Sequence, residues 1–205
     1  MSARGCVFLV DDDEALRRAT TRLLDSHGYA VRGFPSADEF LKQFDASAAG
    51  CLLLDVRMPG QSGFDLQDEL VARGVTLPIV FLTGHAEVST SVRAMKQGAV
   101  DLLEKPVREA DLVQAIERAL ELDKKQRATE GAQAHLKRLY DSLTQREQEV
   151  MAAVVAGQLN KQVAFQLGIA ERTVKLHRAR VLQKMCADSL ADLVRMAEQL
   201  GIGRG

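Results

Sequence analysis

Several chemically reactive side chains lie at the ends of apolar runs in this sequence. Asp11 and Asp12 follow the run Cys6–Val10, and Asp55 closes a second run that begins at Cys51. Carboxylates that meet repel one another unless a hard cation neutralises them, and Mg²⁺ prefers carboxylate oxygen together with water and phosphate. With such an ion in place, a carboxylate oxygen of Asp55 could attack a phosphoryl group.

Two further residues complete this set. Thr83 closes a third apolar run, and Lys105 follows a fourth. Either residue alone at a strand end would usually be incidental, so both count only as members of the set. An ammonium beside the acids would stabilise phosphoryl oxygens. Asp13 is interpreted as a residue of the following helix's first turn rather than as a metal ligand.

The elements that must position these groups alternate regularly over the first 122 residues. The apolar runs predict strands at 6–10, 29–34, 51–56, 79–83 and 100–104, and the amphipathic stretches predict helices at 14–27, 36–44, 64–73, 88–97 and 109–122. This alternation predicts a doubly wound α/β fold with a five-stranded parallel sheet. In the order 2-1-3-4-5, strands one and three are neighbours, so the three carboxylates converge where such folds bind ligands.

The composition turns polar over residues 123–142, which predicts a boundary between domains. Ala115, Leu122, Leu136 and Leu143 fall at heptad multiples, but Thr129 interrupts the series. We interpret this segment as a solvated helical linker rather than a strong coiled coil. The predicted domains are therefore residues 1–122 and 143–205, joined by 123–142.

The last 63 residues predict an all-α domain of four helices at 144–156, 161–167, 171–184 and 190–200. Ala164, Gly168, Ile169 and Val174 have the types and spacing of a helix-turn-helix: the small residue lets two helices approach and the glycine makes the turn. Nine Lys or Arg against six Asp or Glu give residues 143–205 a net charge of +3, whereas residues 1–142 carry −4. The positive net charge of residues 143–205 favours a polyanionic partner.

The third of these helices has two different faces. Val174, Val181 and Met185 form one apolar stripe for the core. The opposite face carries cations with small or apolar groups, which suits phosphates, base edges and thymine methyl groups. Its members are Arg172, Lys175, Leu176, Ala179, Arg180 and Gln183. Ala170 stands where a capping side chain would add roughly 1 kcal/mol.

Four short motifs of the first domain resemble the receiver domain of response regulators. They are Val10-Asp11-Asp12, Asp55 followed by Met58-Pro59-Gly60, Thr83-Gly84-His85, and Glu104-Lys105-Pro106. The resemblance covers roughly residues 5–122 and implies a flavodoxin-like fold. We expect a surface role for His85, and a cis peptide bond before Pro106.

The resemblance also implies a role for each residue of the acidic set. Asp55 would be the phosphoacceptor. Mg²⁺, or another small divalent cation, would be held by Asp12, Asp55 and the backbone carbonyl of Arg57, with Asp11 assisting through water. Thr83 would hydrogen-bond the phosphoryl group and shift inward, and Lys105 would pair with it. Leu102 departs from the family, which often has Tyr or Phe there as a rotamer switch, so the resemblance does not extend to this version of the switch.

The second domain resembles the LuxR-type output domain over three stretches, 143–147, 160–161 and 171–175. The whole chain therefore resembles the FixJ/StyR branch of the NarL group of response regulators. The resemblance implies that Lys175, Leu176 and Ala179 read bases, and that Arg172, Thr173 and Arg178 contact phosphates. Lys161 would contact the DNA backbone.

The leading hypothesis is a DNA-binding response regulator of a two-component system. The expected partners are a sensor histidine kinase, double-stranded promoter DNA and a second copy of the chain. Dimers would form through the fourth-helix and fifth-strand side of the receiver and through residues 190–200. No segment predicts a signal peptide or a membrane span, so a cytoplasmic protein is expected.

Two alternatives remain open. An aspartyl-phosphate phosphatase would commonly present Asp-x-Asp around its nucleophile, but Asp55 is followed by Val56 and Arg57, so we expect no enzyme. A phosphorylation-independent DNA binder is the more credible alternative, because Leu102 could reflect a lost switch. The acidic pair together with Thr83 and Lys105 argues against it.

Overall fold

The computed structural model describes residues 4–84 and 88–202. The chain divides into two compact units, residues 1–126 and residues 127–205. His85, for which we predicted a surface role, lies outside the described residues. In the described part of the chain, no helix is long and apolar enough to cross a membrane.

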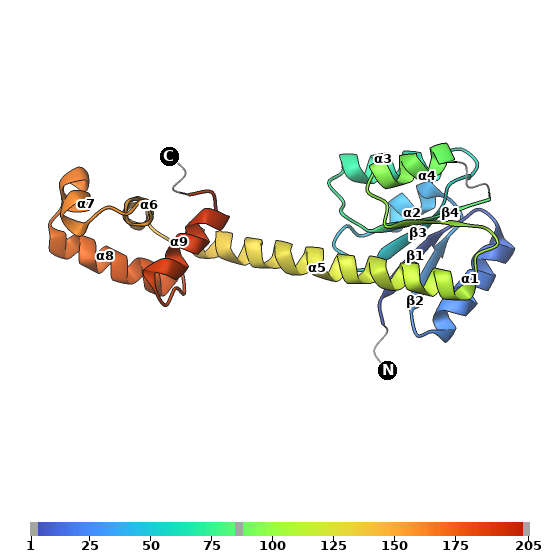
Figure 1. Cartoon of the computed structure of the whole chain (residues 1–205), viewed down its shortest axis with the longest axis horizontal. Coiled ribbons are helices and arrows are strands. Elements are labelled where there is room, and N and C mark those ends of the chain that lie inside the picture. The colour runs from blue at the N-terminus through green and yellow to red at the C-terminus, as the bar shows by residue number, and fades with distance from the viewer. Residues whose placement is uncertain (1–3, 85–87, 203–205) are drawn as a thin grey trace. The chain divides into compact units, whose positions relative to one another are not determined.

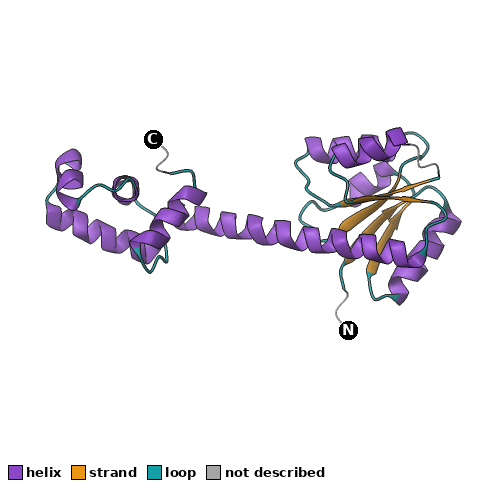
Figure 2. Cartoon of the chain, in the orientation of Figure 1, coloured by secondary structure: helices purple, strands orange, loops and turns teal. Residues whose placement is uncertain are grey.

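The first unit alternates strands and helices around one parallel sheet (Figures 1 and 2). Its strands are β1 (Cys6–Val10), β2 (Ala30–Phe34), β3 (Cys51–Asp55), β4 (Ile79–Thr83) and β5 (Asp101–Glu104). Its helices are α1 (Glu14–Ser26), α2 (Ala37–Gln43), α3 (Gly63–Ala72), α4 (Val88–Lys96) and the beginning of α5 (Glu109–Asp141). The strand order is β2-β1-β3-β4-β5, and every neighbouring pair is parallel. The predicted fold class and strand order are confirmed.

Both faces of this sheet are covered by helices, which is why its strands are apolar throughout. Successive strand residues point to opposite faces. Phe8 and Leu52 pack with α2, α3 and α4 on one face, and Leu9 and Leu53 pack with α1 and α5 on the other (Figure 1). The two cores hold the strands in register and so fix the edge at which the strands end.

Helix α5 is longer than the sequence predicted. We expected one helix to end near residue 122 and a separate helical linker to follow, but the helix runs unbroken from Glu109 to Asp141. The segment contains no proline and is rich in strong helix formers, so nothing in it stops a helix. Asp123, which we assigned to the linker, is buried in the first unit and accepts a hydrogen bond from the Gly50 amide at 3.1 Å. Leu136 is buried in the second unit.

The second unit contains α6 (Gln145–Val155), α7 (Asn160–Leu167), α8 (Glu171–Lys184) and α9 (Leu190–Gln199). Thr144 and Glu147 form a capping box at the start of α6. One core cluster joins the end of α5 to α6, α8 and α9, and another joins α6, α7 and α8. The all-helical second domain is therefore confirmed.

Candidate functional site: an acidic pocket and a helix-turn-helix

The carboxyl ends of β1 and β3 bring three carboxylates together. Val10 lies beside Leu54 in the parallel pair, so Asp11 and Asp55 leave neighbouring strands at the same edge. One carboxylate oxygen from each of Asp11, Asp12 and Asp55 lies within 4.8 Å of the other two. Asp11 and Asp55 are buried, whereas Asp12 is exposed. The structure thus assembles a cluster of three carboxylates, called the acidic pocket below, with one acid open to solvent.

Lys105 balances part of this negative charge. Its Nζ lies 2.8 Å from Asp11 Oδ2 and 2.6 Å from Asp55 Oδ2. Burial by itself lowers the pKa of Lys105, but the hydrogen bonds to Asp11 and Asp55 outweigh burial and hold the pKa above its ordinary value. The Lys105 amide donates to the Thr83 carbonyl at 2.8 Å, so the end of β4 positions this side chain.

The other residues of the predicted receiver set lie on β4, on β5 and directly after Lys105. Thr83 ends β4 and is buried, and Leu82 of the same strand pairs with Asp55. The Lys105–Pro106 peptide bond is cis. Leu102 is partly buried, pairs with Phe81 in the sheet, and packs against the core under α2, α3 and α4.

The loop after β3 is held against the acids. The Arg57 amide donates to Asp55 Oδ1 at 3.1 Å, which brings the Arg57 main chain beside the carboxylate. The Arg57 residue itself is exposed.

Asp13 serves the helix rather than the pocket. Its carboxylate caps α1 by accepting hydrogen bonds from the amides of Ala15 at 2.8 Å and Leu16 at 3.0 Å. The hydrogen bond from the Leu16 amide, helped by the one from the Ala15 amide, lowers the pKa of Asp13. Among the described residues, the group of acids that could share an ion contains Asp11, Asp12 and Asp55 but not Asp13.

Two contacts at this edge were not anticipated from the sequence. Arg17 Nη1 donates to the Asp11 carbonyl oxygen at 2.7 Å. Gly63 opens α3 so close to β3 that a Cβ there would lie 2.3 Å from the Asp55 carbonyl oxygen. An arginine in the first turns after an acidic strand end was a usable signal for the first contact. The second depends on where α3 docks, which the sequence pattern does not specify.

The second unit presents a helix-turn-helix. Gly168 ends α7 with φ +64°, a left-handed conformation that glycine adopts without strain, and the Ile169 amide donates to the Ala164 carbonyl at 3.1 Å. Val163 and Val174 pack in one core cluster against Ala164 and Ile169. The predicted junction between the two helices is thus formed. Ala170 makes no side-chain cap at the start of α8, as expected.

Helix α8 buries one face and exposes the other. Val174, Val181 and Met185 are buried, which matches the predicted apolar stripe. All six residues expected on the outer face are exposed, and the Leu176 side chain is half exposed. They are Arg172, Lys175, Leu176, Ala179, Arg180 and Gln183. Lys161 near the start of α7 is also exposed.

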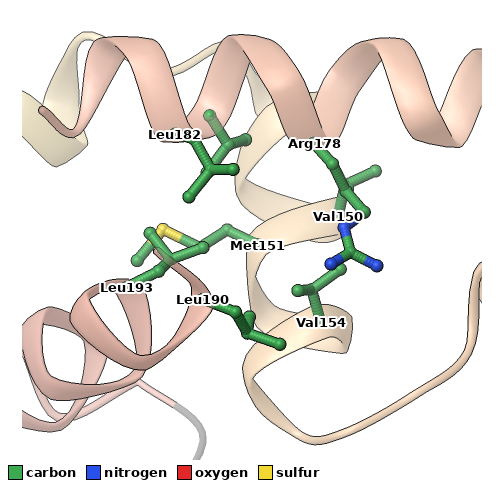
Figure 3. Close-up of a pocket in the computed structure, with 8 residues that line it drawn as sticks. Val150, Met151, Val154, Arg178, Leu182, Leu190 and Leu193 are labelled. Atoms are coloured by element: carbon green, nitrogen blue, oxygen red, sulfur yellow. The ribbon is translucent and has the colours of Figure 1, made fainter. Parts of the chain in front are cut away.

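Arg178 and Thr173 differ from this exposed set, because both are partly buried. Arg178 Nη1 donates to Asn160 Oδ1 at 2.8 Å, which ties α8 to the start of α7. The side chain extends from α8 towards Val154, along a small apolar pocket that α6, α8 and α9 line (Figure 3). The structure therefore gives Arg178 a packing partner within its own domain, separate from the outer face of α8.

The sequence matches two family descriptions. Residues 7–117 match the response regulator receiver domain, and residues 141–197 match the bacterial regulatory proteins of the luxR family.

Individual proteins resemble nearly the whole chain. Nodulation protein W of Bradyrhizobium diazoefficiens is 49% identical over 201 residues, which are 98% of this chain and 88% of that protein. The solved structure of response regulator StyR has a TM-score of 0.88 at 45% identity and covers 95% of this chain and 98% of its own. Full-length FixJ from B. japonicum has a TM-score of 0.59 at 39% identity, with coverages of 97% and 98%.

Proposed function

Because this chain belongs to the response regulators of the FixJ/StyR branch, with a receiver domain and a LuxR-type DNA-binding domain, we propose that phosphorylation of Asp55 by a sensor histidine kinase controls its binding to promoter DNA. The observation that carries this proposal is the meeting of Asp11, Asp12 and Asp55 at one strand edge, with Lys105 bonded to two of them.

The donor set fits Mg²⁺. Three carboxylates within 4.8 Å supply hard oxygen ligands, and the exposed position of Asp12 leaves access for water and phosphate. Asp12, Asp55 and the Arg57 carbonyl would hold the ion, with Asp11 assisting. When bound, the ion supplies positive charge beside the oxygens of the phosphoryl group.

The proposed transfer uses Asp55 as the nucleophile. A carboxylate oxygen of Asp55 forms a bond to phosphorus while the bond from phosphorus to the kinase histidine nitrogen breaks. The nitrogen keeps the electron pair of that bond. The Lys105 ammonium, already 2.6 Å from Asp55 Oδ2, is placed to pair with the new phosphoryl oxygens. The buried Thr83 would hydrogen-bond the same group and change position with it.

The DNA-reading surface in this proposal is the outer face of α8. Lys175, Leu176 and Ala179 read bases and Arg172 contacts phosphate, with Lys161 on the DNA backbone. Thr173 and Arg178 are weaker members of the set because they are partly buried. We assign to Arg178 the support of Asn160 at the start of α7.

A second copy of the chain is the remaining proposed partner. Exposed apolar side chains support this proposal: Val92 and Met95 on α4, and Leu190 on α9. Two copies would double the contacts by binding two half-sites. Sedimentation velocity with and without a phosphodonor tests it. We expect phosphorylation to shift the chain from monomer to dimer. A chain that stays monomeric both when phosphorylated and when bound to DNA would contradict the proposal.

The central experiment treats the full chain with a small acyl phosphate and Mg²⁺, and measures intact mass and binding to duplexes selected from a random pool. The unsubstituted chain should gain one phosphoryl group and bind its selected duplex more tightly, and Asp55→Asn should do neither. Asp13→Asn is the matched control, since it removes a neighbouring charge but keeps a good helix cap. Equal phosphorylation of Asp55→Asn, or equal stimulation of its DNA binding, would overturn the proposal.

A further inference from the structure

We infer that Arg17 is a positioning residue for the acidic pocket: it holds the Asp11–Asp12 peptide so that the Asp12 carboxylate faces Asp55. This inference rests on the proposed function, because it concerns the same Mg²⁺ site. Its evidence is separate, since it comes from the contacts of Arg17 with Asp11 and with Gly33.

Asp11 is held from several sides. Its amide donates to the Phe34 carbonyl at 3.2 Å, its Oδ1 accepts from the Asp13 amide at 2.9 Å, and its Oδ2 accepts from Lys105. The remaining polar group, the main-chain carbonyl, accepts the bond from Arg17 Nη1 at 2.7 Å. That carbonyl belongs to the peptide that joins Asp11 to Asp12, so the bond fixes the plane of this peptide.

Asp12 needs this support more than Asp11 does. It is exposed, and among the described residues no side-chain hydrogen bond or ion pair holds its carboxylate. Its place within 4.8 Å of Asp11 and Asp55 therefore depends on its main chain. A charge-assisted bond is about twice as strong as a neutral one, which suits Arg17 to hold the preceding peptide.

Gly33 provides the surface on which the arginine lies. A Cβ added to Gly33 would come within 3.3 Å of both Cγ and Cδ of Arg17, so the stem of Arg17 packs directly over this glycine of β2. Gly33 does not have the positive φ that would require glycine. The missing side chain at residue 33 therefore serves the close approach of Arg17.

Positioning and charge predict opposite effects on metal affinity. A fixed guanidinium beside a cation site repels the cation, so a purely electrostatic Arg17 would make Arg17→Ala bind Mg²⁺ more tightly. A positioning Arg17 makes the same variant bind more weakly, because Asp12 must then be ordered by the ion. We expect about a tenfold loss for Arg17→Ala, on the scale of the losses seen when supports of metal ligands are removed.

The experiment uses the full chain and follows Mg²⁺ titrations by amide NMR shifts, for the unsubstituted chain, Arg17→Ala, Gly33→Ala and the control Arg18→Ala. Arg18 is exposed on the same helix and pairs with Glu14, so its loss should leave the affinity unchanged. Gly33→Ala keeps the charge of Arg17 but displaces its stem, so it should weaken Mg²⁺ binding several-fold. In the Arg17→Ala background it should have no further effect.

A second measurement separates this inference from the proposed function. In metal-free protein, Arg17→Ala should shift the Asp12 amide resonance and speed its hydrogen exchange, and Arg18→Ala should not. An undisturbed Asp12 amide, or tighter Mg²⁺ binding by Arg17→Ala, would overturn the inference. A failure of the unsubstituted chain to bind Mg²⁺ would overturn the metal site of the proposed function, while the Asp12 amide would still decide the role of Arg17.

Discussion

Lys105 Nζ and Asp55 Oδ2 lie 2.6 Å apart, although 50 residues separate them in the chain. The ammonium also bonds Asp11, and its side chain is 19% exposed. One cation therefore compensates two buried carboxylates before any ion or phosphoryl group arrives. The contacts of Lys105 thus stabilise the first unit and also form part of its proposed reaction site.

Replacing Lys105 should reveal this double role. Lys105→Met leaves Asp11 and Asp55 buried without their cation, so the free energy of unfolding of the first unit should fall by roughly 3 kcal/mol without divalent ions. Added Mg²⁺ should restore part of the loss, because an ion that binds the folded state stabilises it. The chain has no Trp and two Tyr, so Tyr29 fluorescence in a Tyr140→Phe background reports on the first unit during denaturation. Equal stability with and without Lys105 would contradict the prediction.

A methyl group added at Gly63 should displace the main chain of Asp55 and so disturb the acidic pocket. Its Cβ would lie 2.3 Å from the Asp55 carbonyl oxygen, so either α3 or β3 must shift. Gly63→Ala should lower both the unfolding free energy of the first unit and the rate of phosphorylation by an acyl phosphate. Gly131→Ala is the control, because Gly131 lies within α5 with nothing within 4 Å of an added Cβ. Gly131→Ala should raise the free energy of unfolding by up to about 1 kcal/mol. The same sign of effect at both glycines would count against this reading.

The second unit should lose stability in acid through Glu147. Hydrogen bonds, first from Lys184 and then from the Thr144 amide, lower the pKa of the buried Glu147 to about 2. A folded pKa below the unfolded value means that the stabilisation is complete above about pH 4.5 and is lost as the pH falls towards 2. Its size is roughly 2 kcal/mol after allowance for the 36% exposure of Lys184.

Glu147→Gln tests this pair with little change to the helix cap, because Gln also serves in a capping box. The variant should be less stable at pH 7 and should lose the part of the pH dependence between 4.5 and 2 that comes from Glu147. Tyr140 fluorescence in a Tyr29→Phe background follows the second unit. Glu149→Gln breaks an exposed pair with Arg146 and should change stability by less than about 1 kcal/mol. Parallel pH profiles for the Glu147→Gln and unsubstituted chains would refute the assignment.

Substitutions on α8 should separate phosphate contact, base reading and folding. Arg172→Ala should weaken binding to all duplexes alike and reduce the slope of log affinity against log salt by about 1. Leu176→Ala should leave that slope unchanged but alter the preference among duplexes. Arg178→Ala should instead lower the stability of the second unit, because its bond to Asn160 is internal. If Arg178→Ala instead reduced the slope of log affinity against log salt by about 1 and left stability unchanged, Arg178 would be a phosphate contact.

Local patterns in the sequence determined the fold class and the place of the acidic site. Apolar runs alternating with amphipathic stretches determined the parallel sheet, because strands covered on both faces must be apolar along their whole length. The acids at the ends of the runs that form β1 and β3 then had to share one edge. Ala164, Gly168, Ile169 and Val174 determined the helix-turn-helix in the same way, since a tight junction needs small residues at fixed spacing.

Only the tertiary structure decided the contacts that join distant parts of the chain. Asp123 has the polarity of a linker residue, yet it is buried because α5 continues past Gly50. Arg17 over Gly33, Gly63 against Asp55, and Arg178 on Asn160 depend in the same way on how elements dock. A sequence pattern specifies which face of an element is buried, but the partner of each side chain follows from the packing of elements far apart in the chain.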